Sequence, residues 1–337
     1  MTDRFRSGLA AALATAGLVL ALAGDPARAG GDKLVFGLPP IFASTVATVA
    51  DREGFFKKRG VDVEVKFFDA SAPRSAALVS GDIDLNLAST PITIRQISNA
   101  DVDLVALYGM PIGDFLIGST DPARTSCRDL AGQQIGVDAV GGARSVALQD
   151  MLAACGMKIE EVEQVPLTGN ANAQAMIAGR IRIAVLHTEE VGVIEEKGGR
   201  PVRVVTTFSK ARPDSHYLVL VARRDRLQQS RESFVRLMAG LIDAMHFMND
   251  QKNADRVAET VYPIGLSGAE AKAALAGYLK IDFWPIGDDG LDRDRLEAAI
   301  AAQEKEGAIK PGKTVVPYDR LVDRSVWKSA AAIASTH

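Results

Sequence analysis

Three short polar segments of the chain each follow an apolar run of the strand type and precede a helical pattern. They are Ser89–Thr90, Gly142–Ser145 and His187–Glu189. The first turn of a helix has unpaired backbone N–H groups and a positive dipole end, so it attracts anions. Hydroxyl, guanidinium and imidazole groups at the same positions add donors for an oxyanion. These segments therefore indicate a binding site for a carboxylate or a sulfonate.

Arg144 follows Gly141 and Gly142 and lies in the first turn of a predicted helix. A cation at that end opposes the helix dipole and costs a few tenths of a kcal/mol up to about 1 kcal/mol. Bidentate capture of an oxyanion would offset this cost, which makes Arg144 a candidate ligand contact. Alternatively, Arg144 is a solvated side chain, or it pairs with Glu189 while the site is empty.

Several other candidate residues could either contact a ligand or have a purely structural role. His187 could donate to or accept from a ligand, or it could only cap the helix of Glu189, whose carboxylate could prefer a ligand amine. Phe42 and Tyr108 could stack on an aromatic ring or lie in the core. His216 begins a predicted strand that returns to the first half of the chain. The complete set of predicted ligand-binding residues is Pro40, Phe42, Ser89, Thr90, Tyr108, Gly142, Ala143, Arg144, Ser145, His187, Thr188, Glu189 and His216.

The sequence contains no catalytic constellation. There is no Gly-x-Ser-x-Gly elbow and no Walker loop, so we predict neither an enzyme nor a cofactor. Cys127 and Cys155 are the two cysteines, and without clustered histidines they predict no metal site. In an oxidising compartment these cysteines could form a disulfide, and the alternative is two buried free thiols.

An internal repeat positions the polar segments. Residues 78–91 have the pattern of a helix end, a glycine stop, a short strand and a polar loop that opens the next helix. Residues 176–188 repeat this pattern 98 residues later, again with a glycine stop. Two similar βαβ-type halves predict two lobes whose strand ends face each other across a ligand. We therefore expect Ser89 and His187 to line one shared cavity.

Strands alternate with helices along both halves, which predicts α/β lobes with mostly parallel sheets. After Arg224 the pattern is mainly helical, and Leu237, Leu241 and Met245 recur at a spacing that predicts core packing. The predicted division of the chain is a signal peptide at 1–29, a first lobe formed by 30–112 and 216–330 with the C-terminal helices, a second lobe at 113–215, and a loose tail at 331–337.

Size, charge and the N-terminus limit the class of protein. The chain has 337 residues, enough for two lobes with their own cores, and its net charge of −3 gives no support to nucleic-acid binding. Arg4 and Arg6 precede the apolar run 9–23, and Ala27 and Ala29 follow it, as in a signal peptide. A membrane anchor is the alternative, although the run is short for a span. We expect export to the periplasm with cleavage near Ala29.

Four segments occur in the order seen in periplasmic substrate-binding proteins of ABC transporters. They are Gly-Phe-Phe at 54–56, Arg-Gly-Val-Asp-Val at 59–63, Ser-Gly-Asp-Ile-Asp at 80–84 and Asp-Leu-Ala-Gly-Gln-Gln-Ile-Gly-Val at 129–137. Together they resemble the group that includes binders of sulfonates, taurine, nitrate and pyrimidine precursors of thiamine. The resemblance covers residues 33–250.

This resemblance implies a two-lobed α/β periplasmic binding protein fold of type II, with two crossovers and closure by a hinge motion. It implies capture of a small organic anion, a carboxylate, sulfonate or pyrimidine-like molecule, and delivery to an ABC permease in the inner membrane with its ATPase. We expect a monomer without a nucleic-acid partner. Two alternatives use the same scaffold: an enzyme of pyrimidine synthesis or of dehydration, with His187 and Glu189 as its acid–base pair, and a sensory ligand-binding module.

Overall fold

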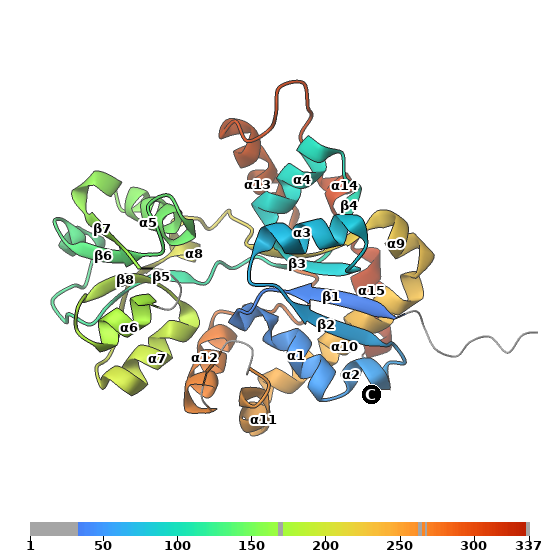
Figure 1. Cartoon of the computed structure of the whole chain (residues 1–337), viewed down its shortest axis with the longest axis horizontal. Coiled ribbons are helices and arrows are strands. Elements are labelled where there is room, and N and C mark those ends of the chain that lie inside the picture. Colours follow the sequence, from blue (N-terminus) through green and yellow to red (C-terminus); the bar gives the residue numbers. More distant parts are fainter. Residues whose placement is uncertain (1–32, 168–170, 262–264, 267, 335–337) are drawn as a thin grey trace, which may run out of the picture. The chain divides into compact units, whose positions relative to one another are not determined.

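The computed structural model describes residues 33–167, 171–261, 265–266 and 268–334. The predicted signal peptide at 1–29 lies outside these residues. The described chain forms two lobes, each built on a five-stranded, mostly parallel sheet that helices flank (Figure 1). The predicted two-lobed α/β architecture is confirmed.

The first sheet has the strand order β2-β1-β3-β10-β4, and β10 runs antiparallel between β3 and β4. Its inner strands are mainly apolar because helices cover both faces of the sheet, and every residue of β4 is buried, whereas the edge strand β2 alternates apolar and charged residues. The strands of this sheet are β1 (Leu34–Leu38), β2 (Val63–Phe67), β3 (Leu85–Ser89), β4 (Leu104–Met110) and β10 (Leu218–Arg223).

The second sheet repeats this order as β7-β6-β8-β5-β9, with β5 as its antiparallel strand. β3 and β8 therefore occupy equivalent places in the two sheets, in agreement with the internal repeat of the sequence. The strands of this sheet are β5 (Phe115–Ser119), β6 (Gln134–Val137), β7 (Glu163–Pro166), β8 (Ile183–His187) and β9 (Arg203–Thr207).

Helices connect and cover the strands. The α-helices are α1 (Thr45–Arg52), α2 (Phe55–Lys58), α3 (Ser71–Ser80), α4 (Thr90–Ala100), α5 (Ala143–Ala154), α6 (Ala171–Ile177), α7 (Thr188–Gly198), α8 (Phe208–Ala211), α9 (Arg224–Gln229), α10 (Arg231–Asn249), α11 (Ala254–Ala258), α12 (Gly268–Lys280), α13 (Arg293–Lys305), α14 (Tyr318–Leu321) and α15 (Ser325–Ala334). Short 3-10 helices lie at Phe42–Ser44, Cys127–Leu130, Ile159–Glu161 and Gln251–Asn253.

Apolar side chains on the two faces of the first sheet form separate clusters. On one face, Phe36 and Leu87 pack with side chains of α1, α10, α12 and α15. On the other face, Ala88 and Ala106 pack with α4, α13 and α14. The predicted core role of α10 is confirmed, since residues such as Met245 are buried along its inner stripe.

The chain passes between the two sheets at 111–114 and again at 212–217. A further connection is α12, which contributes to the core of the first sheet and also packs against α7 of the second lobe (Figure 1). An ion pair of 2.7 Å between Lys197 and Glu270 joins these two helices. The helices approach closely at Gly192, where an added Cβ would lie 2.6 Å from the Cβ of Ala273.

Cys127 and Cys155 form a disulfide, with their Cα atoms 6.1 Å apart. This bond joins the 3-10 helix before β6 to the residue that follows α5. A disulfide of this kind stabilises the fold mainly by restricting the unfolded chain.

The predicted loose tail is wrong for residues 331–334, because α15 continues to Ala334. Val326, Trp327 and Ala330 are buried on its inner side and anchor the helix. Residues 335–337 of the predicted tail lie outside the described residues.

In the ranges that the structure describes, we find no helix with both the length and the apolar composition of a membrane span.

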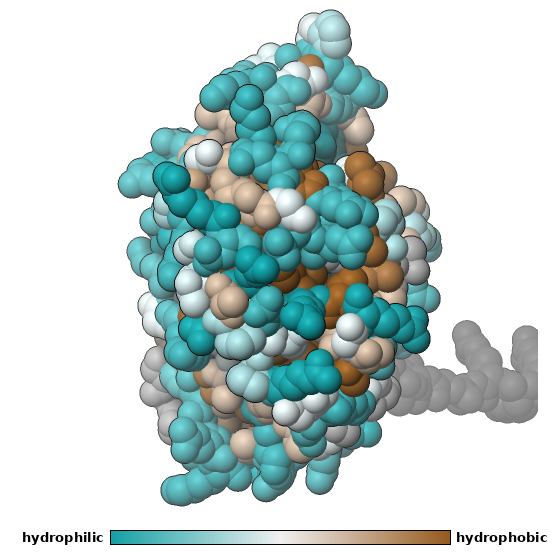
Figure 2. Space-filling view, turned by 90° about the vertical axis from the view of Figure 1, so that its left-hand side faces the viewer, coloured by the Kyte–Doolittle hydropathy of each residue, from teal (hydrophilic) through white to brown (hydrophobic). Residues whose placement is uncertain are grey.

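Figure 2 shows that the face on the side of the second sheet is mainly hydrophilic, with hydrophobic side chains gathered in small patches. Two exposed valines of this lobe, Val140 (69% exposed) and Val146 (50% exposed), flank the start of α5. They give the N-terminus of that helix an apolar rim.

Candidate functional site

The polar segments predicted from the sequence lie where strands end and helices begin. β3 ends at Ser89 and α4 begins at Thr90, while β8 ends at His187 and α7 begins at Thr188. Ser89 and His187 are both extended N-cap residues, with ψ angles of 133° and 159°. The repeat in the sequence thus corresponds to a repeat in local geometry.

One cavity between the lobes, the α4–α5 cavity, has a volume of about 570 Å³. The N-terminal residues of α4 contribute Ser89 and Pro91, and those of α5 contribute Gly142 and Ala143. Its other walls come from the second crossover, including His216, from α13, and from aromatic side chains of both lobes. Elements of both sheets therefore enclose this cavity.

The second cavity, the α5–α7 cavity, has a volume of about 390 Å³. Pro40 and Ile41 line it from the loop after β1, and Arg144 lines it from α5. His187 and Glu189 line it from the start of α7. This cavity also has walls from both sheets.

The expectation that Ser89 and His187 share a cavity is wrong, because Ser89 lines the α4–α5 cavity and His187 lines the α5–α7 cavity. The reason is the packing of Phe115, which lines the first cavity and whose ring lies 4.4 Å from that of His187 between centroids. The imidazole is also fixed by Asp114, whose Oδ2 lies 2.9 Å from Nδ1 of His187.

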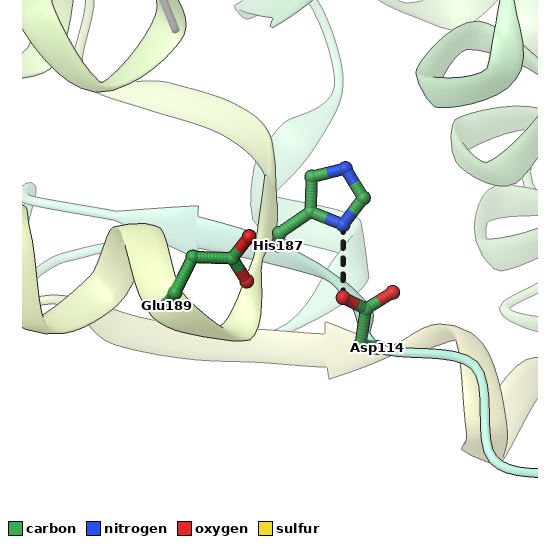
Figure 3. Close-up of side chains that lie close together, drawn as sticks. All are labelled: Asp114, His187 and Glu189. Carbon is green, nitrogen blue, oxygen red and sulfur yellow. Dashed lines mark hydrogen bonds and ion pairs between the residues drawn. The ribbon is translucent and has the colours of Figure 1, made fainter. Parts of the chain in front are cut away.

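Four side chains form a hydrogen-bonded cluster, the Asp114 cluster, which comprises Asp114, His187, Glu189 and Tyr278. Figure 3 shows Nδ1 of His187 directed at Asp114, with the Glu189 carboxylate beside them. The hydroxyl of Tyr278 on α12 lies 2.5 Å from Oδ2 of Asp114 and 2.6 Å from Oε2 of Glu189. The cluster thus joins the first crossover, α7 and α12.

Burial and mutual charge set the protonation of this cluster. Burial lowers the pKa of His187, but the charge and hydrogen bond of Asp114 outweigh it and raise that pKa to about 9. Burial also raises the pKa of Asp114, yet the charge of His187 and hydrogen bonds from His187 and Tyr278 leave it below its ordinary value. Burial raises the pKa of Glu189 to about 7, against the opposing charge of His187. His187 and Asp114 therefore form an ion pair, whereas the Glu189 carboxyl group changes its protonation state near neutral pH.

Arg144 is 6% exposed, so it is not a solvated side chain. Its Nη1 donates to the backbone oxygen of Val185 and to Oε2 of Glu190, both at 2.6 Å. Its carboxylate partner is thus Glu190 and not Glu189, the alternative given by the sequence, and Glu190 also accepts a hydrogen bond of 2.8 Å from the backbone N–H of His187. Arg144 thus fastens α5 to the start of α7.

A sequence model described as NMT1/THI5 like matches residues 42–254, more than half of the chain. The chain belongs to the NMT1/THI5-like family. A protein of Brucella abortus (strain 2308) that is named as a binding protein is 24% identical over 221 residues, which cover 65% of this NMT1/THI5-like chain and 68% of the relative.

Solved structures share the fold of this NMT1/THI5-like protein. The ligand-binding component of an ABC-type import system from Staphylococcus aureus, with zinc bound, has a TM-score of 0.66 at 15% identity and covers 89% of this chain and 99% of its own. The alkanesulfonate-binding protein SsuA from Xanthomonas axonopodis pv. citri, bound to MOPS, has a TM-score of 0.61 at 17% identity. The match covers 87% of this chain and 99% of SsuA. The desulfurization enzyme DSZB has a TM-score of 0.62 at 17% identity, and the match covers 90% of this chain and 99% of DSZB. The fold is therefore the periplasmic binding protein fold of type II.

His216 of this NMT1/THI5-like protein has a satisfied structural environment, although it also lines the α4–α5 cavity. Its Nε2 lies 2.8 Å from the backbone oxygen of Gly290, so this nitrogen carries the proton. Its Nδ1 accepts from the hydroxyl of Thr90 at 2.9 Å. Burial lowers the pKa of His216 to about 4 and keeps the ring neutral. His216 and Thr90 thus hold the second crossover against the start of α4.

Two predicted aromatic contacts lie in the core. Phe42 is fully buried and stacks on Tyr278, with ring centroids 4.9 Å apart. Tyr108 is also fully buried, stacks on Trp327, and donates its hydroxyl to the backbone oxygen of Pro285 at 2.9 Å. C-terminal helices cover both side chains, so neither lines the two cavities described above.

Two further predicted residues stabilise helix starts. The Ser145 hydroxyl donates to Gln164 at 2.5 Å and accepts from the backbone N–H of Gly141. The Thr188 hydroxyl donates to the backbone oxygen of Asp114 at 3.1 Å. Both hydroxyls are committed to protein partners.

The chemistry of the Asp114 cluster would suit a metal such as zinc, since an imidazole and two carboxylates lie with their ligand atoms within 4.8 Å of one another. However, the Tyr278 hydroxyl lies within hydrogen-bond distance of both carboxylates, and Nδ1 of His187 donates a hydrogen bond to Asp114. A metal would have to displace both of these interactions, so we assign no metal ligands here.

Sequence reasoning missed Asp114, Tyr278 and the aromatic wall of the α4–α5 cavity. Asp114 lies between two buried strands, and a lone acid in such a crossover is a signal that could have been used. Tyr278 gives no such signal, because its position depends on the packing of α12 against α7.

Proposed function

We propose that this protein is the exported solute-binding component of an ABC importer and that it captures a small organic anion. The family and the fold support a solute-binding role. One observation carries the choice of ligand: α4 from the first lobe and α5 from the second open on the same cavity of about 570 Å³. Because helix N-termini favour anions, a carboxylate or sulfonate suits this position.

The acid group of the ligand would lie between Ser89 and Gly142, the N-cap residues of α4 and α5. The side chain of Ser89 does not cap its own helix, and Gly142 has no side chain to do so. No N-cap side chain occupies the first-turn N–H groups of either helix. The N–H of Thr90 donates to the backbone oxygen of Tyr217 and that of Arg144 to Oδ1 of Asp138, so the ligand would use the other first-turn N–H groups. The Ser89 hydroxyl is a further donor.

The charged side chains at the cavity wall add one net negative charge, which the helix termini must outweigh. Arg212 lies 3.3 Å from Asp150 and 3.6 Å from Asp214, so this group has one acid more than bases. The side chain of Asp214 is 60% exposed, so solvent and salt screen its charge. Arg95 and Glu306 contribute one charge of each sign. The helix termini are thus the groups at this wall that favour an anion.

The apolar body of the ligand would lie against Phe115, Phe208 and Tyr217. These side chains all line the cavity, and the ring of Phe115 lies 6.5 Å from that of Phe208 and 6.2 Å from that of Tyr217. They take the place that the sequence analysis gave to Phe42 and Tyr108. Aromatic faces of this kind suit a flat or aliphatic organic group.

Ligand capture would proceed by closure of the two lobes about the crossovers at 111–114 and 212–217. The occupied protein would then dock to a permease in the inner membrane and its ATPase. The Xanthomonas alkanesulfonate-binding protein, which shares the fold, supports an organic acid as the class of ligand.

Isothermal titration of Ala143→Glu against a panel of small carboxylates and sulfonates tests this proposal. Ala143 is exposed at the first position of α5 and lines the cavity, so a glutamate there stabilises the helix but repels an anion. We expect at least roughly tenfold weaker binding, on the order of 1.4 kcal/mol.

The matched control is Gln149→Glu, which adds the same charge to the same helix at an exposed position outside the cavity lining. This variant should bind as the parent protein does. Equal affinities for the two variants would exclude the α5 N-terminus from the site, and flat titrations of the parent protein across the panel would refute the proposed ligand class.

A further inference from the structure

The α5–α7 cavity has an excess of acidic side chains over bases. Among the side chains at its wall, Arg144 pairs with Glu190, and Lys197 pairs with Glu270 at 2.7 Å. The third base is His187, whose charge is compensated by Asp114 behind the wall. Two acids of the lining, Asp138 and Glu189, remain without an ion pair to a described residue.

The acceptor groups of these acids are only partly used. Asp138 accepts through Oδ1 alone, from the backbone N–H groups of Ala139 and Arg144. Glu189 uses Oε2 alone among the described residues, and this oxygen lies 2.6 Å from the Tyr278 hydroxyl. Glu190 is 5% exposed, and its Oε1 has no hydrogen-bond partner among the described groups. A buried carboxylate oxygen without a donor is costly, so this wall lacks hydrogen-bond donors as well as positive charge.

The hydroxyl of Tyr278 supplies an independent argument. It has one proton but lies within hydrogen-bond distance of two carboxylates, those of Asp114 and Glu189. If the proton goes to Asp114, then Glu189 must carry a proton of its own to bond to the phenol oxygen. With the phenol proton on Asp114, a protonated Glu189 satisfies the empty cavity, and a cation beside Glu189 would replace that proton.

We propose that the α5–α7 cavity binds a small organic cation, an ammonium or an amidinium, with Glu189 and Asp138 as its anionic partners. The N–H groups of the cation donate to Oε1 of Glu189 and to Oδ2 of Asp138. Binding releases the proton of Glu189 to the buffer, so that charge is conserved in the cavity. This site is separate from the α4–α5 cavity and does not depend on the function proposed for it.

The groups that face Glu189 define the expected pH dependence. They are Asp114 on the first crossover, Tyr217 on the second crossover, His187 and Glu190 on its own segment, Tyr278 on α12, and the more distant Arg144 on α5. Since His187 and Asp114 compensate each other, the titration of Glu189 itself controls the affinity. The pKa of about 7 for Glu189 means that binding should strengthen as pH rises towards that value and level off above it.

Isothermal titration with putrescine and agmatine tests the proposal, with tetramethylammonium as a cation that has no N–H donor. The parent protein should bind putrescine or agmatine and should not bind tetramethylammonium. Glu189→Gln keeps the size and removes the charge, and it should weaken binding at least roughly tenfold. Glu196→Gln, an exposed acid on the same helix, is the matched control and should leave binding unchanged.

The affinity of the parent protein should rise between about pH 6 and about pH 8, whereas that of Glu189→Gln should not. Asp138→Asn provides a second variant in case Glu189→Gln does not fold. Unchanged affinity in the charge-removing variants, equal binding of tetramethylammonium, or no heat from either N–H-bearing cation at millimolar concentration would overturn the proposal. Anion binding that persists in Glu189→Gln would show that the function proposed for the α4–α5 cavity stands regardless.

Discussion

At the scale of single residues, the His187–Asp114 pair dominates the electrostatics of the lobe junction. The pair buries two opposite charges within 2.9 Å of each other, and the side chain of Asp114 is only 4% exposed. Removal of either partner alone would leave a buried charge uncompensated, which is strongly unfavourable. The pair therefore contributes to stability as well as to the shape of the α5–α7 cavity.

The stability of this pair should depend on pH in a defined direction. The pKa of His187 rises from 6.5 to about 9 on folding, so its contribution is fully present below pH 6.5 and is lost as pH rises through 9. Urea unfolding of the parent protein and of His187→Gln should differ most below pH 6.5, by up to about 3 kcal/mol. The difference should shrink above pH 9.

His246→Gln serves as the control, because His246 is exposed on α10 and far along the chain from this cluster. Its difference from the parent protein should stay small across the same pH range. A gap between the parent protein and His187→Gln that does not change with pH would contradict the ion pair.

At the residue scale, the sequence predicted where the polar segments lie but not which side chains bond to one another. The segments Ser89–Thr90 and His187–Glu189 do lie at helix starts, because an N-cap after an apolar strand is a local pattern. Arg144 was a candidate ligand contact with Glu189 as one alternative partner, but it bonds to Glu190. Consecutive residues on a helix point about 100° apart, and only the packing of α5 on α7 decides which one faces the arginine.

At the scale of elements, the contact between α7 and α12 links the two lobes. It includes the ion pair between Lys197 and Glu270, the hydrogen bond between Tyr278 and Glu189, and the close approach of Gly192 to Ala273. Any movement of one lobe against the other must either carry α12 along with α7 or separate these contacts.

Two glycines on α7 provide a matched test of this contact. An added Cβ at Gly192 would lie 2.6 Å from Ala273, whereas one at Gly198 would lie at least 3.6 Å from its nearest neighbour. Alanine at Gly198 should leave the protein unchanged or stabilise it by up to about 1 kcal/mol through helix propensity. Alanine at Gly192 should destabilise it by about 1–3 kcal/mol, because the helices must move apart. Thermal unfolding of both variants measures the difference, and equal midpoints would argue against tight packing of α12 on α7.

Most elements could be predicted from the sequence because their signals are local. The glycine stops at Gly81 and Gly179 and the alternating strands indicated both halves of the repeat. The burial of Phe42 and Tyr108 could not be predicted, since it depends on helices more than 150 residues further along the chain. For the same reason the sequence placed α12 with the first lobe and gave no sign of its contact with α7.

At the scale of the whole described molecule, two cavities lie on either side of the packed ring pair Phe115–His187. One is bordered by two helix N-termini and aromatic rings, which suits an organic anion. The other is bordered by surplus acids, which suits a cation. The single shared cavity expected from the sequence is thus two chemically different ones, separated by side chains whose packing no local pattern predicts.

A crystal structure of the protein in complex with the carboxylate or sulfonate that binds it most tightly tests the central claim most directly. We predict that the acid group lies within hydrogen-bond distance of the Ser89 hydroxyl and the first-turn N–H groups of α4 and α5, with the rest of the ligand against Phe115 and Tyr217. A ligand bound with its acid group away from both helix starts would contradict the account.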